Sequence, residues 1–191
     1  LTHAQIPSDF LSERDVADGE LDRYKVCYFS GPNLTGAAAR KLTAWVKAGG
    51  TLWLTAGACA RDEYNRPLKF LEDILPVQRE PETELQPFLG AGWHIHQLKT
   101  NGAVHAGATS MQILSMRQAI TPKPDAETEI LAVFDDQTPA LVRGRIGNGT
   151  LYCCGFLPAM HYIKTAEDAR NALAAAQPVD IPAPLAPTTG E

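Results

Sequence analysis

One cysteine stands where this chain could hold a reactive group. Cys59 lies within Gly57–Arg61 (Gly-Ala-Cys-Ala-Arg), which directly follows the apolar run Thr51–Thr55. A thiol on such a strand-to-loop turn has the position of a hydrolytic nucleophile, provided that an imidazole, a cation or a helix N-terminus lowers its pKa. Arg61 is a nearby cation in the sequence. The alternative, which we favour, is a small residue tolerated in a tight turn.

Polar residues that follow two expected strands form a candidate ligand site. Asn33 comes after the first strand, and Arg61, Asp62 and Glu63 come after the second. Ligands of open parallel sheets collect beyond the carboxyl ends of the strands. We therefore keep these four residues as candidates for binding a small ligand such as a sugar.

The histidines offer a weaker candidate for metal binding. His94 and His96 would share one face of a short strand, and His105 could add a third zinc ligand. A polar strand face in a loop region explains the pair better. The adjacent carboxylates Asp135 and Asp136 belong to a turn, where solvated acids are routine. We therefore expect neither a metal nor a cofactor.

The composition excludes several classes of protein. The chain has 191 residues, of which 45% are hydrophobic and 20% are charged, as in a soluble globular domain. A net charge of −5 and the lack of a basic cluster argue against nucleic-acid binding. No apolar run is long enough to cross a membrane. The chain begins Leu1-Thr2-His3, which we interpret as a cut inside a longer protein or a processed end, and the compartment stays open.

The elements around Cys59 form a strand–helix–strand unit. Residues 24–30 are a continuous apolar run, typical of a strand buried on both faces. A helix is predicted from Thr35, a plausible N-cap, to Ala48, before the stop at Gly49-Gly50. Thr51–Thr55 is the second strand. This spacing predicts two parallel strands with a right-handed crossover.

The last third of the chain changes to hairpins. Turn signals at Asp135-Asp136 and Gly147-Asn148-Gly149 separate apolar runs. We predict strands over 110–120, 128–135, 139–146 and 150–156, followed by a helix over 166–176. The fold class is thus α/β, expected as a three-layer αβα sandwich with a mostly parallel sheet and antiparallel hairpin strands in the C-terminal third.

The remaining segments are less regular. Residues 4–11 could form an edge strand, and Leu68–Leu75 a short helix. Residues 77–108 are interpreted as a loop with one short strand at 93–98. The domain is expected to occupy 1–176, and the proline-rich residues 177–191 to form a linker or tail.

The first strand and the cysteine turn resemble the class I glutamine amidotransferases. Tyr24–Asn33 is similar to a strand of that family that ends in a Gly-Gly-Pro turn. The family carries its cysteine in a Gly-x-Cys-x-Gly turn, and Gly57–Arg61 keeps the first glycine and the cysteine but has arginine in place of the second glycine.

The rest of that family's catalytic machinery is missing. Its base and orienting acid lie in a late Phe-His-Pro-Glu segment, whereas Phe156–Ala159 has Leu157 and Ala159 at those two positions. Hydrocarbon side chains can neither accept a proton from a thiol nor orient an imidazole. His161 is close in sequence but lies on the wrong side of Pro158 to be an obvious substitute.

A degenerate branch of this fold, the trimerisation domain of β-galactosidases, resembles the chain more closely. The resemblance covers roughly residues 15–165, without 77–108, and the chain lacks the opening strand and helix of that flavodoxin-like domain. Its motifs are Leu21–Lys25, Gly31–Thr35, Trp45–Leu52, Asp62-Glu63, Pro139-Ala140 and Gly147–Gly149. The resemblance implies a scaffold that packs against neighbouring subunits, in a parent protein that is a glycoside hydrolase.

The leading hypothesis is therefore a non-catalytic, degenerate amidotransferase-like domain that serves oligomerisation or architecture in a larger, carbohydrate-active protein. Its partners would be other copies or neighbouring domains of the parent chain, with no nucleic acid and no membrane. One alternative is a Cys59-dependent hydrolase or transferase that uses His161 or His105 as its base. The other is a sugar-binding module built on Asn33 and the 61–63 segment.

Overall fold

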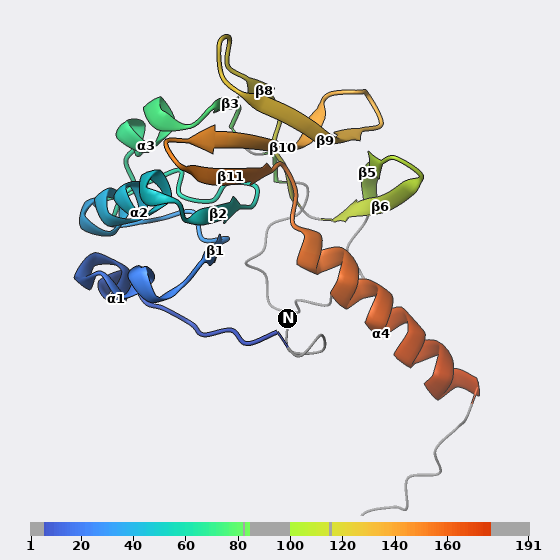
Figure 1. Ribbon diagram of the computed structural model, residues 1–191. Coiled ribbons are helices and arrows are strands. Elements are labelled where there is room, and N and C mark those ends of the chain that lie inside the picture. Colours follow the sequence, from blue (N-terminus) through green and yellow to red (C-terminus); the bar gives the residue numbers. More distant parts are fainter. Residues whose placement is uncertain (1–5, 82, 85–99, 115, 177–191) are drawn as a thin grey trace, which may run out of the picture.

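The computed structural model describes residues 6–81, 83–84, 100–114 and 116–176. A seven-stranded sheet in the order β1-β2-β11-β10-β9-β5-β6 forms its centre (Figure 1). Two small two-stranded sheets, β3-β8 and β4-β7, accompany it. The strands are β1 (Val26–Phe29), β2 (Thr51–Leu54), β3 (Val77–Arg79), β4 (Thr83–Glu84), β5 (Thr100–Ala106), β6 (Thr109–Leu114), β7 (Met116–Arg117), β8 (Ile120–Pro122), β9 (Thr128–Phe134), β10 (Pro139–Ile146) and β11 (Gly149–Cys154).

Four α-helices and one 3₁₀ helix complete the described elements. They are α1 (Glu13–Asp18), η2 (Glu20–Arg23), α2 (Gly36–Ala48), α3 (Lys69–Ile74) and α4 (Pro158–Ala176). No helix among the described residues is long and apolar enough to cross a membrane.

The order β1, α2 and β2 confirms the predicted strand–helix–strand unit with two parallel strands. The Thr35 hydroxyl accepts a hydrogen bond from the Ala38 N–H at 3.3 Å and caps α2, and Gly49 ends the helix with φ near +133°. β1 and β2 pair in parallel, with Tyr28 opposite Trp53. β11 then adds in parallel on the other side of β2.

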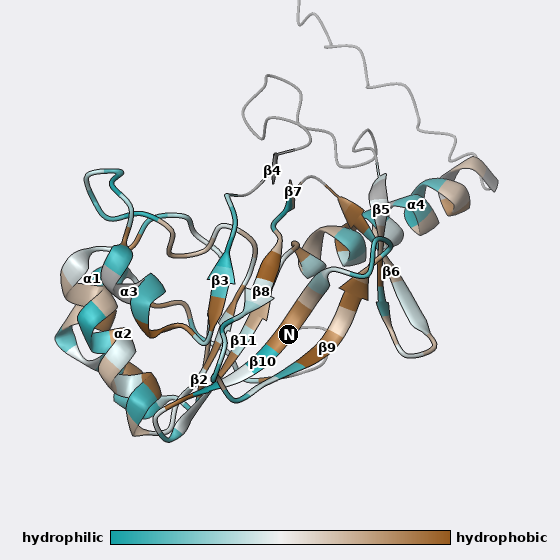
Figure 2. Cartoon of the chain, turned by 90° about the horizontal axis from the view of Figure 1, so that it is seen from above, coloured by the Kyte–Doolittle hydropathy of each residue, from teal (hydrophilic) through white to brown (hydrophobic). Residues whose placement is uncertain are grey.

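Close packing joins this unit to the C-terminal strands. A Cβ added at Gly149 would lie 1.9 Å from the Val46 carbonyl oxygen, so only glycine lets the start of β11 approach α2. One cluster of buried residues unites α1 and α2 with β2, β10 and β11, and it includes Leu42, Leu54 and Leu151. Figure 2 shows hydrophobic residues concentrated along these central strands. The helices α1 to α3 all pack on this one side of the sheet.

The α/β class and the C-terminal hairpins are confirmed, but the expected layering is not. Only the β1–β2 and β2–β11 pairs of the seven-stranded sheet are parallel, so the sheet is not mostly parallel. Among the described residues the third layer is missing. No described helix lies on the face of β1, β2 and β11 that is opposite to α1, α2 and α3. β1 is the edge strand of a sheet covered on one side, and its residues alternate between exposed and half-buried. The prediction of burial on both faces was wrong for this reason.

Other boundaries also differ from the sequence-based expectations. Residues 6–11 form no strand, and the helix α1 that follows begins at a Ser12–Asp15 capping box. β3, β4 and β5 lie in the stretch interpreted mainly as loop, and the expected strand at 93–98 falls outside the described residues. α4 starts at Pro158 and not at 166, because proline fits the first turn of a helix. The tail at 177–191 also lies outside the described residues.

Candidate functional site

The turns that follow β1 and β2 lie side by side, as expected for the carboxyl ends of parallel strands. The Cys59 N–H donates to the Gly31 carbonyl at 2.9 Å, and the Arg61 N–H donates to the Pro32 carbonyl at 3.0 Å. Cys59 has φ near +54°, a left-handed conformation that non-glycine residues rarely adopt. The thiol therefore occupies a constrained turn between the two strand ends.

Burial keeps the Cys59 thiol protonated. Its side chain is completely inaccessible to solvent. Desolvation raises the pKa of Cys59 far above its ordinary value, and the nearby Arg79 guanidinium offsets only part of this effect. A nucleophilic cysteine needs the opposite, an accessible thiol with a depressed pKa. The turn has the geometry of one that presents a nucleophilic cysteine, but its surroundings do not activate the Cys59 thiol.

The cation close to Cys59 is Arg79, and not Arg61 as the sequence suggested. The side chain of Arg79 is 2% exposed, forms an ion pair with Glu72 and donates through Nη1 to the Ala58 carbonyl at 2.5 Å. Arg61 is exposed and donates to the Asn65 carbonyl at 3.3 Å. Since Arg79 already has a carboxylate and a carbonyl partner, its main effect is to hold the Ala58-Cys59 turn in place.

A buried glutamine closes the same turn from the other side. Gln118 is 3% exposed; its Oε1 accepts from the Gly57 N–H at 3.0 Å, and its Nε2 donates to the Glu80 carbonyl at 2.9 Å. The main-chain N–H of Gln118 donates to the Gly155 carbonyl at 2.7 Å. A peptide N–H at such a turn could stabilise an oxyanion, but the Gly57 N–H is already used.

The proposed bases are engaged elsewhere or lack a contact with the thiol. His105 lies on β5, and its Nε2 hydrogen-bonds Asp135 Oδ1 at 2.7 Å. His161 lies in α4, and no hydrogen bond joins either imidazole to Cys59 among the described residues. His94 and His96 fall outside the described residues. No cluster of metal-ligating side chains occurs in the described ranges.

The four predicted ligand-binding residues lie together, and their polar groups hold the loop. Asn33 Nδ2 donates to the Asp62 carbonyl at 3.0 Å. The Asp62 carboxylate forms an ion pair with Arg66 at 2.9 Å and accepts its N–H. Glu63 Oε2 accepts from the Gly36 N–H at 2.9 Å, which caps α2. These bonds give Asn33, Asp62 and Glu63 structural roles at the end of the sheet that carries Cys59.

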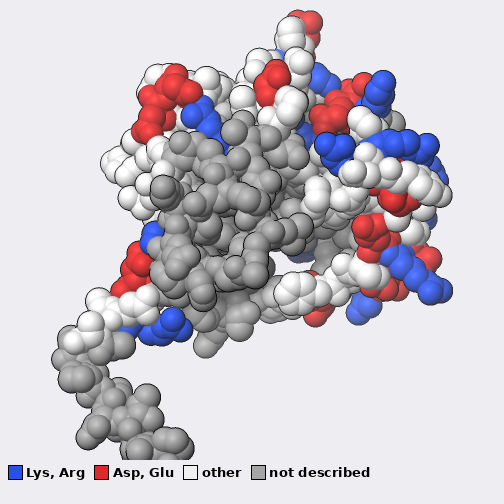
Figure 3. Space-filling model, turned by 180° about the vertical axis from the view of Figure 1, so that it is seen from behind, with Lys and Arg blue, Asp and Glu red and all other residues white. Residues whose placement is uncertain are grey.

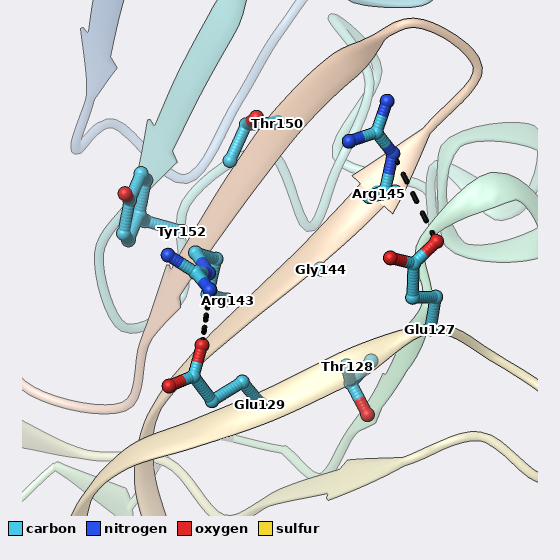
Figure 4. A pocket seen from close by; sticks show the side chains of 8 residues that line it. All are labelled: Glu127, Thr128, Glu129, Arg143, Gly144, Arg145, Thr150 and Tyr152. Atoms are coloured by element: carbon cyan, nitrogen blue, oxygen red, sulfur yellow. Dashed lines mark ion pairs between the residues drawn. The ribbon is translucent and has the colours of Figure 1, made fainter.

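A separate groove lies on the strands of the C-terminal third (Figure 4). It has a volume of about 380 Å³ and is lined by Glu127, Thr128, Glu129, Arg143, Gly144, Arg145, Thr150 and Tyr152. An ion pair between Arg143 and Glu129 bridges β10 to β9, and a second pair joins Arg145 Nε to Oε2 of Glu127, just before β9, at 3.9 Å. Guanidinium, carboxylate and hydroxyl groups at the edge of an aromatic ring can hydrogen-bond a small polar ligand.

Sequence reasoning missed this groove because its residues come from three strands. Arg143 and Arg145 are two residues apart and share one face of β10, and Glu127 and Glu129 have the same spacing at the start of β9. That alternation was the available signal, but only the strand register shows that Arg143 stands opposite Glu129. Figure 3 shows acidic and basic side chains intermingled among many of the described residues of one face of the molecule.

Comparison with known proteins gives structural neighbours only. No protein-family model and no curated protein sequence matches the chain. The GH42 β-galactosidase Gan42B of G. stearothermophilus aligns with 18% identity and a TM-score of 0.62 over 84% of this chain. The GH42 enzymes are much longer proteins, and the aligned region covers 22% of Gan42B.

Two further structural neighbours have a similar sequence identity and TM-score. The β-galactosidase of Bacillus circulans sp. alkalophilus has 18% identity and a TM-score of 0.59, with 83% of this chain and 24% of that chain covered. A cytoplasmic protein from Salmonella typhimurium has 18% identity and a TM-score of 0.56, with 81% of this chain and 71% of that chain covered. The chain thus shares its fold with one small domain of β-galactosidases and with a small protein of similar length.

Proposed function

We propose that this chain is a non-catalytic domain that serves the assembly or architecture of a larger, carbohydrate-active protein. The observation that carries the proposal is the state of Cys59, whose thiol is sealed in the core. Its pKa is raised, no imidazole hydrogen-bonds it among the described residues, and the neighbouring Gly57 N–H is already bonded to Gln118. A fold that keeps the shape of a nucleophile turn without an activated thiol is suited to a scaffold.

The structural neighbours support the larger context. In the GH42 β-galactosidases, the aligned region is about a fifth to a quarter of a long chain, 22% in Gan42B and 24% in the Bacillus circulans enzyme. A domain of this size without its own chemistry can contribute by packing against other domains or subunits. Likeness of fold alone does not establish a function, so assembly has to be measured directly.

Two measurements test the proposal. The purified chain is assayed for hydrolysis of glutamine, p-nitrophenyl esters and p-nitrophenyl galactosides, with the Cys59→Ala variant as the control. Its association state is determined by sedimentation velocity between micromolar and hundred-micromolar concentrations. We expect no hydrolysis that depends on Cys59, and reversible self-association. Cys59-dependent turnover, or a monomer at every concentration, would overturn the proposal.

Binding of a saccharide is the second candidate function, and the groove on β9, β10 and β11 favours it. The groove combines the Arg143–Glu129 pair with Tyr152, which together offer hydrogen-bonding groups and an aromatic ring. A ligand that binds only the folded state raises the melting temperature. A panel of mono- and disaccharides at millimolar concentration is expected to give a shift that Arg143→Ala removes; the absence of any shift excludes this candidate at those concentrations.

A further inference from the structure

A patch of large side chains crosses the face of the sheet opposite to α2. The strand register aligns Tyr28 with Trp53 and Trp53 with Tyr152, so these three residues point from one face of β1, β2 and β11. The Trp53 and Tyr152 rings stack with centroids 5.0 Å apart, and the Tyr28 and Trp53 centroids are 5.9 Å apart. Tyr28 is 59% exposed and its strand neighbour Val26 is 46% exposed. We refer to Val26, Tyr28, Trp53 and Tyr152 as the open-face patch.

The arrangement of the strands makes this exposure unusual. β1, β2 and β11 are mutually parallel, and parallel strands nearly always have both faces covered. Here α1 and α2 pack on one face, and among the described residues no helix covers the open-face patch. Val26 and Tyr28 are the exposed part of this surface, whereas Trp53 also packs partly against the cluster of buried residues that contains Phe134. An exposed apolar surface marks a place where another molecule or segment packs.

Among the described residues, the helix that follows β11 also leaves large apolar side chains exposed. α4 has 19 residues, and Met160 in its first turn is buried against the domain. Farther along, Ile163 is 45% exposed and Leu173 is 67% exposed. Figure 1 shows α4 running away from the sheet. Isolated helices of this length are marginally stable in water, so α4 also gains from a surface to pack on.

We propose that α4 of a second copy of this chain packs on the open-face patch, and that the exchange is reciprocal. This inference rests on the proposed function in assembly and names its partner and surface. Ile163, Ala166 and Leu173 are spaced by three and seven residues and therefore share one side of α4. A helix laid on a sheet restores the layer that the parallel strands lack.

The area of such a contact favours reciprocity. A helix of this length is about 28 Å long and about 10 Å wide, so laying it on a sheet removes on the order of 400 Å² from each partner. A stable interface needs about 800 Å² from each partner. One helix on one patch reaches about half of that area, whereas a reciprocal exchange gives each copy two such contacts.

Polar residues border the patch on one side. Arg143 stands next to Tyr152 across the β10–β11 pair, and Arg145 stands next to Thr150. Arg143 pairs with Glu129 on β9, and Arg145 pairs with Glu127, which directly precedes β9. An apolar centre with a charged, half-exposed border is the usual composition of a protein interface.

The test compares variants of the whole chain by sedimentation velocity. Tyr28→Glu places a charge in the open-face patch, and Leu173→Glu places one on the proposed contact side of α4. Each is expected to weaken self-association at least tenfold, since a charge would be buried in the contact. The matched controls are Tyr64→Glu, at a tyrosine that is 70% exposed in the 62–66 loop, and Asn171→Glu, on the other side of α4. Both controls are expected to associate like the unmodified chain.

A mixture of the Tyr28→Glu and Leu173→Glu chains tests the reciprocal exchange directly. A Tyr28→Glu chain keeps an intact α4, and a Leu173→Glu chain keeps an intact patch. Their mixture keeps one intact contact of the two and is therefore expected to associate more strongly than either variant alone, but more weakly than the unmodified chain. Circular dichroism of each variant checks that the fold is retained, and Val26→Ser with Ile163→Ser replaces any variant that unfolds.

The outcomes separate this inference from the proposed function. If the chain associates and both variants leave association unchanged, the helix exchange is refuted and the assembly role stands. If Tyr28→Glu weakens association and Leu173→Glu does not, a second copy meets the patch by another surface, and the exchange is refuted. A mixture that associates no more strongly than either variant alone also refutes the exchange. A chain that is monomeric at every concentration refutes both proposals.

Discussion

The two faces of the same strands have opposite characters. On the covered face, Leu52, Leu54 and Leu151 are fully buried under α2, where glycine at 149 permits the closest approach of helix and strand. On the opposite face, the same three strands carry Tyr28, Trp53 and Tyr152, whose rings contact one another but remain partly exposed. The covered face includes the Cys59 turn and supplies stability, whereas the open face is the surface that we propose for contact with a second copy. The predictions below test that division.

The largest effect is expected in the covered face. Leu54→Ala removes buried methyl groups and leaves a cavity, which should lower the free energy of unfolding by about 3 to 4 kcal/mol. Val26→Ala on the open face should cost less than about 1 kcal/mol in the monomer. Urea unfolding of both variants gives the two values, and equal losses would contradict the division between the faces.

The next effect concerns the cation that holds the cysteine turn. Arg79→Met leaves the Ala58 carbonyl without its donor and Glu72 without its ion-pair partner. We expect a loss of about 2 to 3 kcal/mol in unfolding free energy, because buried polar groups without partners are costly. Arg61→Met is the matched control and should change stability by less than about 0.5 kcal/mol. A similar loss from both substitutions would show that Arg79 has no special role.

A smaller effect is expected in alkaline solution. Burial raises the pKa of Cys153 from 9.0 to about 12. Because the folded pKa is the higher one, the unfolded thiol loses its proton first. The contribution to stability is therefore complete below pH 9 and is lost as the pH rises from 9 toward 12.

Chemical denaturation under reducing conditions checks this dependence between pH 8 and pH 10.5. Cys153→Ala should make the alkaline decline in unfolding free energy less steep, by up to roughly 1.4 kcal/mol per pH unit. Parallel pH profiles for the two proteins would mean that Cys153 ionises equally easily in the folded and unfolded states.

The smallest effect is expected at the groove. Arg143 and Glu129 form an ion pair with side chains that are 51% and 52% exposed, where solvent screens the charges. A double-mutant cycle with Arg143→Gln and Glu129→Gln should give a coupling below about 1 kcal/mol that decreases further with salt. A larger coupling that does not depend on salt would show that this ion pair stabilises the fold as the buried contacts of the covered face do.

Local signals predicted the β1-α2-β2 unit and the hairpins well. Thr35 as a cap, the glycine stop after α2 and the Gly147-Asn148-Gly149 turn each act within a few residues. The exposure of β1 could not be predicted in the same way. An apolar run indicates a strand, but whether both of its faces are covered depends on which helices pack on the sheet.

The site was less predictable because its contacts are distant in sequence. Arg79 reaches Ala58 across 21 residues, and Gln118 reaches Gly57 across 61 residues. No local pattern marks either pair. The sequence did locate Cys59 on its turn beside Gly31 and Pro32, since strand ends that neighbour each other in a parallel sheet bring their turns together.

The insertion of β11 between β2 and β10 also affects how the chain is made. During synthesis β1, α2 and β2 leave the ribosome before β11, which pairs with the free edge of β2 and is the last of the described strands. Until then that edge exposes unpaired peptide groups, which can pair with other nascent chains. Productive folding therefore awaits the C-terminal strands, and we expect chaperone dependence to concentrate in this interval.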